Sequence, residues 1–214
     1  MSSIWVNHDT RLIFLGVPKN ASTSIRKSLK FNEGLENQKK SLNPKIKELS
    51  DYKAFSIIRN PIKRFVSAYY ETLKRKERGA QMQPYFRMAG SGKFIQFITD
   101  VENSFFDGHV VTQYSCISDN DKLLDIDFII DFDCIEEQLI KEKIVPSNFH
   151  LRKNNIGNNS GIDDIECLLE SREDLRNRIS EIYKKDFYIY NKLKEGFTTN
   201  EIKKKINGAG WDSL

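Results

Sequence analysis

The chain has 214 residues, of which 39% are hydrophobic and 30% charged, with 11 glycines and 5 prolines. This composition excludes collagen-like, low-complexity and wholly disordered proteins. The formal net charge of +4 suits a small anionic ligand and does not call for nucleic acid as a partner.

The length favours a single domain over residues 1–214 that buries its own core. The three cysteines are widely spaced, which predicts neither a disulfide framework nor a cysteine metal site. No apolar run approaches the ~18–20 residues of a membrane span. The first residues have neither the basic start nor the apolar run of a signal peptide. We therefore expect a soluble protein of the cytoplasm that does not bind membranes.

The first half of the chain alternates short apolar runs with helix signals. Arg11–Val17 has no helical period and predicts a buried strand, paired with Ile4–Val6. A loop and the start of a helix follow. Lys53–Arg59 predicts a second strand, and behind Asn60 a helix is expected over Pro61–Arg78, because proline favours the first helical position after an asparagine cap.

The second half repeats this alternation with weaker signals. Helices are predicted over Gly92–Val101, Cys134–Lys143 and Leu175–Leu193, and a strand over Asp125–Asp131. A polar tail is expected from about Gly196. The recurring strand–loop–helix units predict an α/β domain whose central, mostly parallel sheet is flanked by helices.

The loop after the first buried strand has the spacing of a phosphate-binding loop. In the pattern G-x-x-x-x-G-K-[ST], Gly16 and Thr23 fit, but Ala21 replaces the second glycine and Ser22 replaces the lysine. The lysine of this segment, Lys19, lies inside the loop instead. Backbone amides at the start of a helix bind anions. The displaced lysine argues against a small ATP-dependent kinase, which remains an alternative interpretation.

A second anion site is predicted after the second strand. Arg59 ends that strand, where open α/β sheets place their ligands. Arg64 and Ser67 are three residues apart on the following helix and are expected to share a face. Guanidinium groups and a hydroxyl beside a helix N-terminus form a suitable phosphate cradle.

Together these segments resemble sulfotransferases that use 3′-phosphoadenosine 5′-phosphosulfate (PAPS). Residues 17–24 are similar to their 5′-phosphosulfate loop and read VPKNASTS. Residues 55–70 are similar to their 3′-phosphate motif, R-N-P-x-x-R-x-x-S-A-Y, and read FSIIRNPIKRFVSAYY. The greatest similarity is to the Golgi carbohydrate sulfotransferases of the chondroitin and heparan 2-O types, whose H-x-x-x-Q segment resembles residues 108–113. Residence in the Golgi is not implied.

This resemblance implies sulfuryl transfer from PAPS to a hydroxyl acceptor, expected to be a saccharide, with 3′,5′-ADP as the product. Lys19 would neutralise the departing phosphate, so no metal is expected. The residues implied in donor binding are Lys19, Asn20, Ala21, Ser22, Thr23, Ser24, Arg59, Arg64 and Ser67.

The base that removes the proton of the acceptor has two candidates. His109 lies in the family-like segment, and the pKa of histidine, about 6.5, suits a general base near neutral pH. Glu33 is the rival, because many members of the family place a histidine or glutamate between the two phosphate motifs. A non-enzymatic module that binds polyanions through Lys74–Arg78 is the alternative outside catalysis.

Overall fold

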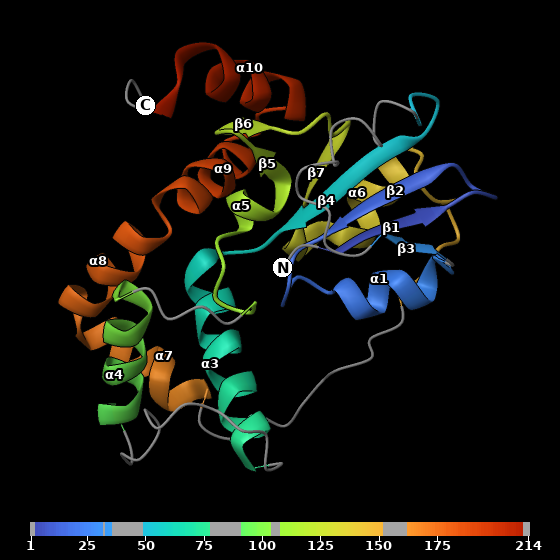
Figure 1. Ribbon diagram of the computed structural model, residues 1–214. Helices are drawn as coiled ribbons and strands as arrows, with labels where there is room; N and C mark the ends of the chain where they lie inside the picture. The colour runs from blue at the N-terminus through green and yellow to red at the C-terminus, as the bar shows by residue number, and fades with distance from the viewer. Residues whose placement is uncertain are drawn as a thin grey trace.

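A five-stranded sheet forms the centre of the molecule (Figure 1). The computed structural model describes residues 3–31, 33–35, 49–77, 91–103, 108–151 and 162–211. In sheet order, the strands are β3 (Glu33–Leu35), β1 (Ser3–Asn7), β2 (Leu12–Gly16), β4 (Lys53–Ile58) and β7 (Phe128–Asp131). Only β1 among them opposes the direction of the rest, so the expected mostly parallel α/β sheet is confirmed.

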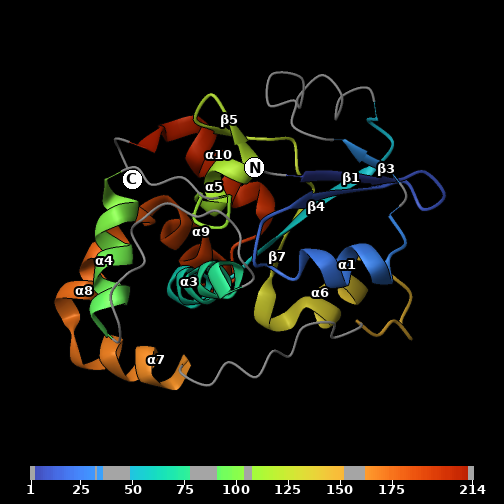
Figure 2. The same cartoon turned by 60° about the horizontal axis from the view of Figure 1, so that its bottom comes forward.

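Helices cover both faces of the sheet because its strands are apolar on both sides. Along β2, Phe14 points to one face and Leu15 to the other, as the two-residue period of a strand requires. The helices on the Phe14 face are α1 (Ser22–Ser28) and α6 (Ile135–Lys141). Those on the Leu15 face are α5 (Gln113–Ile117), α9 (Lys184–Lys194) and α10 (Thr199–Ala209). Figure 2 shows the two groups on opposite sides of the strands.

A separate helical cluster packs beside the sheet. Its members are α3 (Pro61–Glu77), α4 (Ser91–Glu102), α7 (Ile162–Ser171) and α8 (Glu173–Ile182). Aromatic rings join them: the centroids of Phe65 and Phe97 are 5.0 Å apart, and those of Tyr69 and Phe94 are 5.1 Å apart. The helix α3 begins at Pro61, as predicted. The basic run Lys74–Arg78 lies outside the residues whose side chains are described.

Two short elements complete the described chain. A small hairpin joins β5 (Ser118–Asp119) to β6 (Lys122–Leu123). A 3₁₀ turn, η2 (Phe132–Cys134), links β7 directly to α6. Among the described helices, none is both long and apolar enough to cross a membrane.

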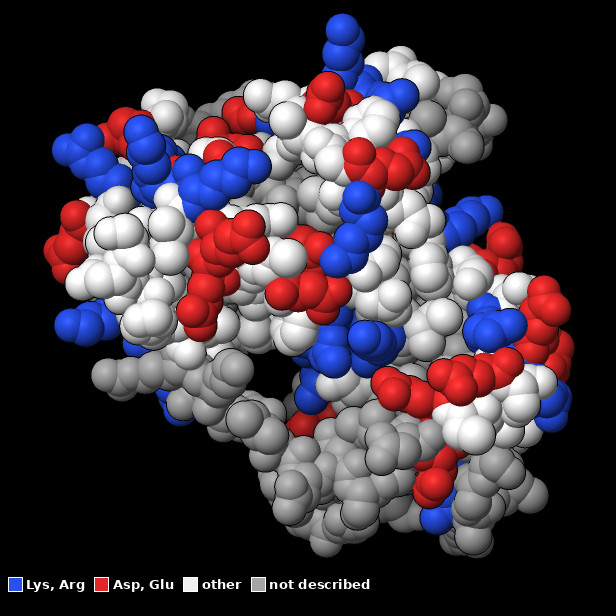
Figure 3. All heavy atoms as spheres, turned by 180° about the vertical axis from the view of Figure 1, so that it is seen from behind, with Lys and Arg blue, Asp and Glu red and all other residues white. Residues whose placement is uncertain are grey.

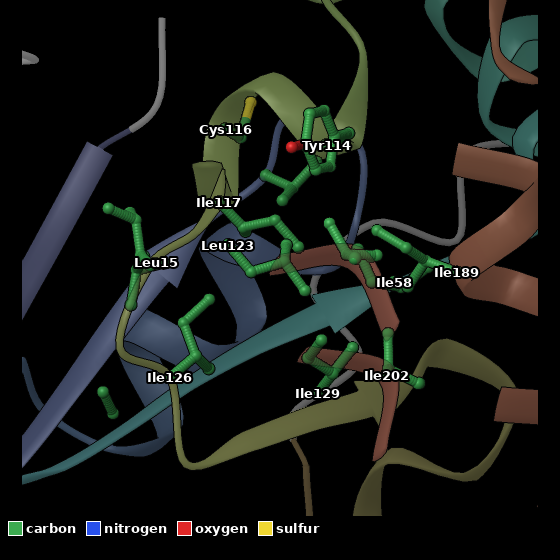
Figure 4. Close-up of a cluster of buried hydrophobic side chains, with 14 of the residues drawn as sticks. Leu15, Ile58, Tyr114, Cys116, Ile117, Leu123, Ile126, Ile129, Ile189 and Ile202 are labelled. Atoms are coloured by element: carbon green, nitrogen blue, oxygen red, sulfur yellow. The ribbon is translucent and has the colours of Figure 1, made fainter. Parts of the chain in front are cut away.

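The C-terminal region differs from the sequence expectation. The single helix predicted over Leu175–Leu193 is two helices, α8 and α9, separated at Tyr183. The sequence pattern merged them because the apolar period continues across the break. The expected polar tail contains α10, which begins with a capping box formed by Thr198 and Glu201. Ile202 of α10 is fully buried and lies with Ile189 of α9 in the core cluster of Figure 4.

Candidate functional site

A cavity of about 930 Å³ lies where β2, β4 and β7 end. Parallel strands bring the loops that follow them to the same edge of the sheet, so residues distant in sequence meet there. The volume falls in the range of sites for small ligands and nucleotides. Of the residues predicted from sequence, the cavity is lined by Lys19, Ala21, Ser22, Thr23, Ser24, Arg59, Ser67 and His109.

The loop between β2 and α1 is held in a strained conformation. Lys19 and Ala21 have φ angles of 69° and 58°, a left-handed region that L-residues other than glycine seldom adopt. The hydroxyl of Ser22 donates to the carbonyl of Val17 at 2.7 Å, which closes the loop on itself. The N-cap residue Ala21 gives α1 no side-chain cap. The first amides of α1 therefore suit an anionic ligand.

The side chain of Asn20 does not line the cavity, which corrects its assignment as a donor-binding group. It is fully buried, and its Nδ2 donates to the carbonyl of Ile57 at 2.7 Å and to Oε1 of Gln113 at 2.6 Å. Gln113 also accepts from the backbone amide of Arg59 at 2.9 Å and donates to the Arg59 carbonyl at 2.8 Å. The buried side-chain amide of Gln113 thus links the loop after β2 to the end of β4.

Arg59, which belongs to the second predicted anion site, also contacts the loop of the first. Its Nη1 donates to the carbonyl of Lys19 at 3.2 Å, and its guanidinium lies 4.6 Å above the ring of Phe132. Burial lowers the pKa of Arg59 from its usual value, while the charge of Asp133 acts in the opposite direction. The guanidinium still stays protonated at neutral pH, because its usual pKa is so high. A partly desolvated cation here strengthens the binding of a phosphate.

Arg64 is not part of the cavity wall, which corrects the prediction that it binds phosphate. Its side chain is 1% exposed. Its Nε donates to the carbonyl of Pro18 at 3.0 Å, and its Nη2 donates to the carbonyls of His109 at 3.2 Å and Val111 at 2.6 Å. Arg64 therefore holds together the loop after β2 and the segment that carries His109.

A buried carboxylate supports the same segment from the other side. Asp186 of α9 accepts from the backbone amides of Gln113 and Tyr114, each at 2.7 Å. Burial raises the pKa of Asp186 to about 6, although the nearby charge of Arg64 opposes this shift. Neither Asp186 nor Gln113 was singled out as a site residue in the sequence, because nothing local shows that α9 packs against α5.

Lys19 has a partner in the cavity that the sequence interpretation missed. Its Nζ lies 3.4 Å from Oε2 of Glu71, and both side chains are partly exposed to the cavity. Glu71 is four residues after Ser67 on α3, so the two share a helix face. The four-residue spacing from Ser67 to Glu71 was the feature of the sequence that could have identified Glu71 as a residue of the site.

Glu33, the alternative base, lies at the wrong end of the sheet. It pairs in register with Val6, which is opposite Ile13 near the start of β2, whereas the cavity lies beyond the end of β2. Its carboxylate contacts His8 Nε2 at 2.7 Å on the surface. The prediction of Glu33 is therefore wrong for this fold, and His109 is the described histidine on the cavity wall.

Another part of the cavity wall comes from the segment after β7. Phe132, Asp133 and Ile135 line the cavity there, together with Glu136 and Glu137 of α6. The sequence predicted this strand and helix but gave their residues no role. On the molecular face drawn in Figure 3, acidic and basic side chains of the described residues are interspersed. That distribution offers no support for a polyanion-binding surface on this face.

Comparison with known protein families matches residues 2–192 to the family described as the sulfotransferase family. No curated protein and no solved structure matches the chain significantly. Within the described ranges, no group of three or more His, Cys, Asp or Glu residues is arranged to hold a metal ion.

Proposed function

The chain belongs to the sulfotransferase family, and we propose that it transfers the sulfuryl group of PAPS to a hydroxyl group of a carbohydrate. One observation carries the choice of donor. Arg59 and Ser67, from the motif that resembles a 3′-phosphate site, line the same cavity as the phosphate loop. A donor with phosphate groups at both the 5′ and the 3′ position would use both sets of residues, whereas ATP would leave the second set without a partner.

The donor-binding residues have distinct proposed roles. The backbone amides of Ser22, Thr23 and Ser24 would hold the 5′-phosphate at the start of α1. The guanidinium of Arg59 and the hydroxyl of Ser67 would hold the 3′-phosphate. PAPS would supply the activated sulfuryl group. The cavity volume and this set of donors fit such a nucleotide.

Transfer also needs relief of charge on the departing phosphate and removal of a proton from the acceptor. Lys19 is proposed for the first role, because its ammonium enters the cavity from within the phosphate loop. His109 is proposed as the base, since it lines the same cavity and its backbone carbonyl is fixed by Arg64. The carbohydrate acceptor rests on the resemblance of the two phosphate motifs and the His109–Gln113 segment to carbohydrate sulfotransferases.

Calorimetry with three nucleotides tests the choice of donor. We expect 3′,5′-ADP to bind more than tenfold more tightly than 5′-ADP or ATP, because tenfold corresponds to about 1.4 kcal/mol, within the reach of one charge-assisted contact. In Arg59→Ala this preference should disappear. Equal affinities for 3′,5′-ADP and 5′-ADP in the unmodified protein would refute the proposal, and tighter binding of ATP would favour the kinase. A panel of saccharides incubated with PAPS that is labelled in its sulfuryl group then identifies the acceptor.

A further inference from the structure

A carboxylate lies beside the cation that is expected to meet the terminal group of the donor. Glu71 reaches the cavity from α3, and Lys19 reaches it from the loop after β2. Their charged atoms are 3.4 Å apart, and the side chains are 28% and 21% exposed. A negative charge in a site that binds anions weakens the binding of every anion, and it weakens the binding of the more highly charged ones most.

The charge of the terminal group is what separates a sulfate donor from a phosphate donor. A sulfate monoester carries one negative charge, whereas a terminal phosphate carries about −1.5 to −2 near neutral pH. Any group that binds Lys19 Nζ lies close to Glu71, because the two side chains are in contact. In phosphate loops that bind nucleoside triphosphates, a lysine meets the β and γ phosphates. In this chain the carboxylate of Glu71 offsets the charge of Lys19.

We propose that Glu71 is a specificity-determining residue that favours a 5′-phosphosulfate over a 5′-diphosphate by reducing the positive charge where the terminal group binds. The inference rests on the proposed function, because it takes Lys19 as the contact of the terminal group. The other acidic residues of the cavity, Asp133, Glu136 and Glu137, come from the wall after β7 and not from α3. Glu71 contacts Lys19 directly, with 3.4 Å between the charged atoms.

The effect should be measurable because the charges are close and partly shielded from water. An additional unit charge near a carboxylate in a partly buried site is repelled far more strongly than in bulk water, although salt reduces the effect. We expect Glu71 to account for about a tenfold difference in dissociation constant between the two ligand classes, which corresponds to about 1.4 kcal/mol.

The test compares PAPS with its analogue adenosine 3′-phosphate 5′-diphosphate, which differs in the terminal group. Dissociation constants are obtained by displacement of labelled 3′,5′-ADP, without any acceptor. The unmodified protein should prefer PAPS. In Glu71→Gln the preference should shrink by about five- to tenfold, chiefly because the diphosphate binds more tightly. Glu137→Gln removes the same charge from the part of the wall formed by α6 and should change the preference by less than twofold.

A preference that stays within twofold of the original in Glu71→Gln would overturn the inference, as would an equal change in Glu137→Gln. Glu71→Ala, made in parallel, removes the same charge if the glutamine variant is unstable. Binding of 3′,5′-ADP separates this inference from the proposed function. If 3′,5′-ADP still binds more tightly than 5′-ADP, while the preference for PAPS over the diphosphate analogue is unchanged in Glu71→Gln, only the role of Glu71 fails. If that selectivity is absent in the unmodified protein, the proposed function fails.

Discussion

Removing the guanidinium of Arg64 should destabilise the protein strongly. The side chain is 1% exposed and donates to three backbone carbonyls, those of Pro18, His109 and Val111. It also lies 6.0 Å from the ring of Tyr183. Arg64→Met preserves most of the volume but removes the guanidinium donor from three partly buried carbonyls.

The magnitude follows from the cost of those unsatisfied carbonyls. A buried acceptor left unpaired costs about 1–3 kcal/mol, and these partly buried carbonyls fall toward the lower end of that range. The three are neighbours and can relax together, so their costs will not add fully. We therefore expect Arg64→Met to lower the free energy of unfolding by about 3–5 kcal/mol, a large share of the 5–15 kcal/mol typical of a domain. Arg64→Lys should recover only part of this loss, because an ammonium cannot reproduce the planar geometry of the guanidinium.

Urea denaturation at neutral pH measures the change directly. The matched control is Arg178→Met, which makes the same chemical change at the partly exposed pair of Arg178 with Glu102, where both side chains are 32% exposed. We expect the control to lose only about 1 kcal/mol, because exposed ion pairs contribute little. If the free energy of unfolding of Arg64→Met is within 1 kcal/mol of that of the unmodified protein, the three carbonyls do not depend on Arg64 and the reasoning is refuted.

The remaining predictions concern turnover and pH. Lys19→Ala should lower turnover about 100-fold or more while 3′,5′-ADP binding weakens far less, as single-turnover kinetics and calorimetry can measure; turnover within threefold of the original would assign the role to another group. His109→Gln should lower turnover by about 10²–10⁴-fold and remove the dependence on a group titrating near neutrality; an unchanged pH–rate profile would exclude His109 as the base. Because burial raises the pKa of Asp186 from 3.8 to about 6, the folded state binds more protons than the unfolded state between these values. The contribution of Asp186 to the free energy of unfolding should therefore be greatest below about pH 4 and decrease as the pH rises to about 6. Urea denaturation across this range should show a smaller decrease in Asp186→Asn, and equal pH dependence in both proteins would contradict the assignment.

Local sequence was sufficient for the elements that carry the phosphate motifs. The strand before Lys19 is a continuous apolar run, and Pro61 marks the start of α3 by its chemistry. The predicted edge of the sheet then brought Arg59 and Ser67 to the same cavity as the loop. These outcomes depend on periodicity and on the geometry of parallel strands, which are properties of short segments.

Local sequence was not sufficient where long-range packing decides the role of a polar side chain. Arg64 and Ser67 are three residues apart on one helix, yet Ser67 lines the cavity and Arg64 binds carbonyls from two other segments. Glu33 lies between the two motifs in sequence, but its pairing with β1 carries it to the far end of the sheet.

The sequence by itself therefore determined the α/β class, the strand and helix on either side of the loop that carries Lys19, and the residues that resemble a family motif, because strand and helix periods are local. Tertiary structure alone decided that Glu71 meets Lys19, that Gln113 fixes Asn20 to Arg59, and that α10 joins the core. The first two of these findings rest on hydrogen bonds between residues 52 to 93 positions apart in the chain. Spacing along the chain specifies which face of a helix a side chain occupies, and only the packed fold specifies what that face contacts.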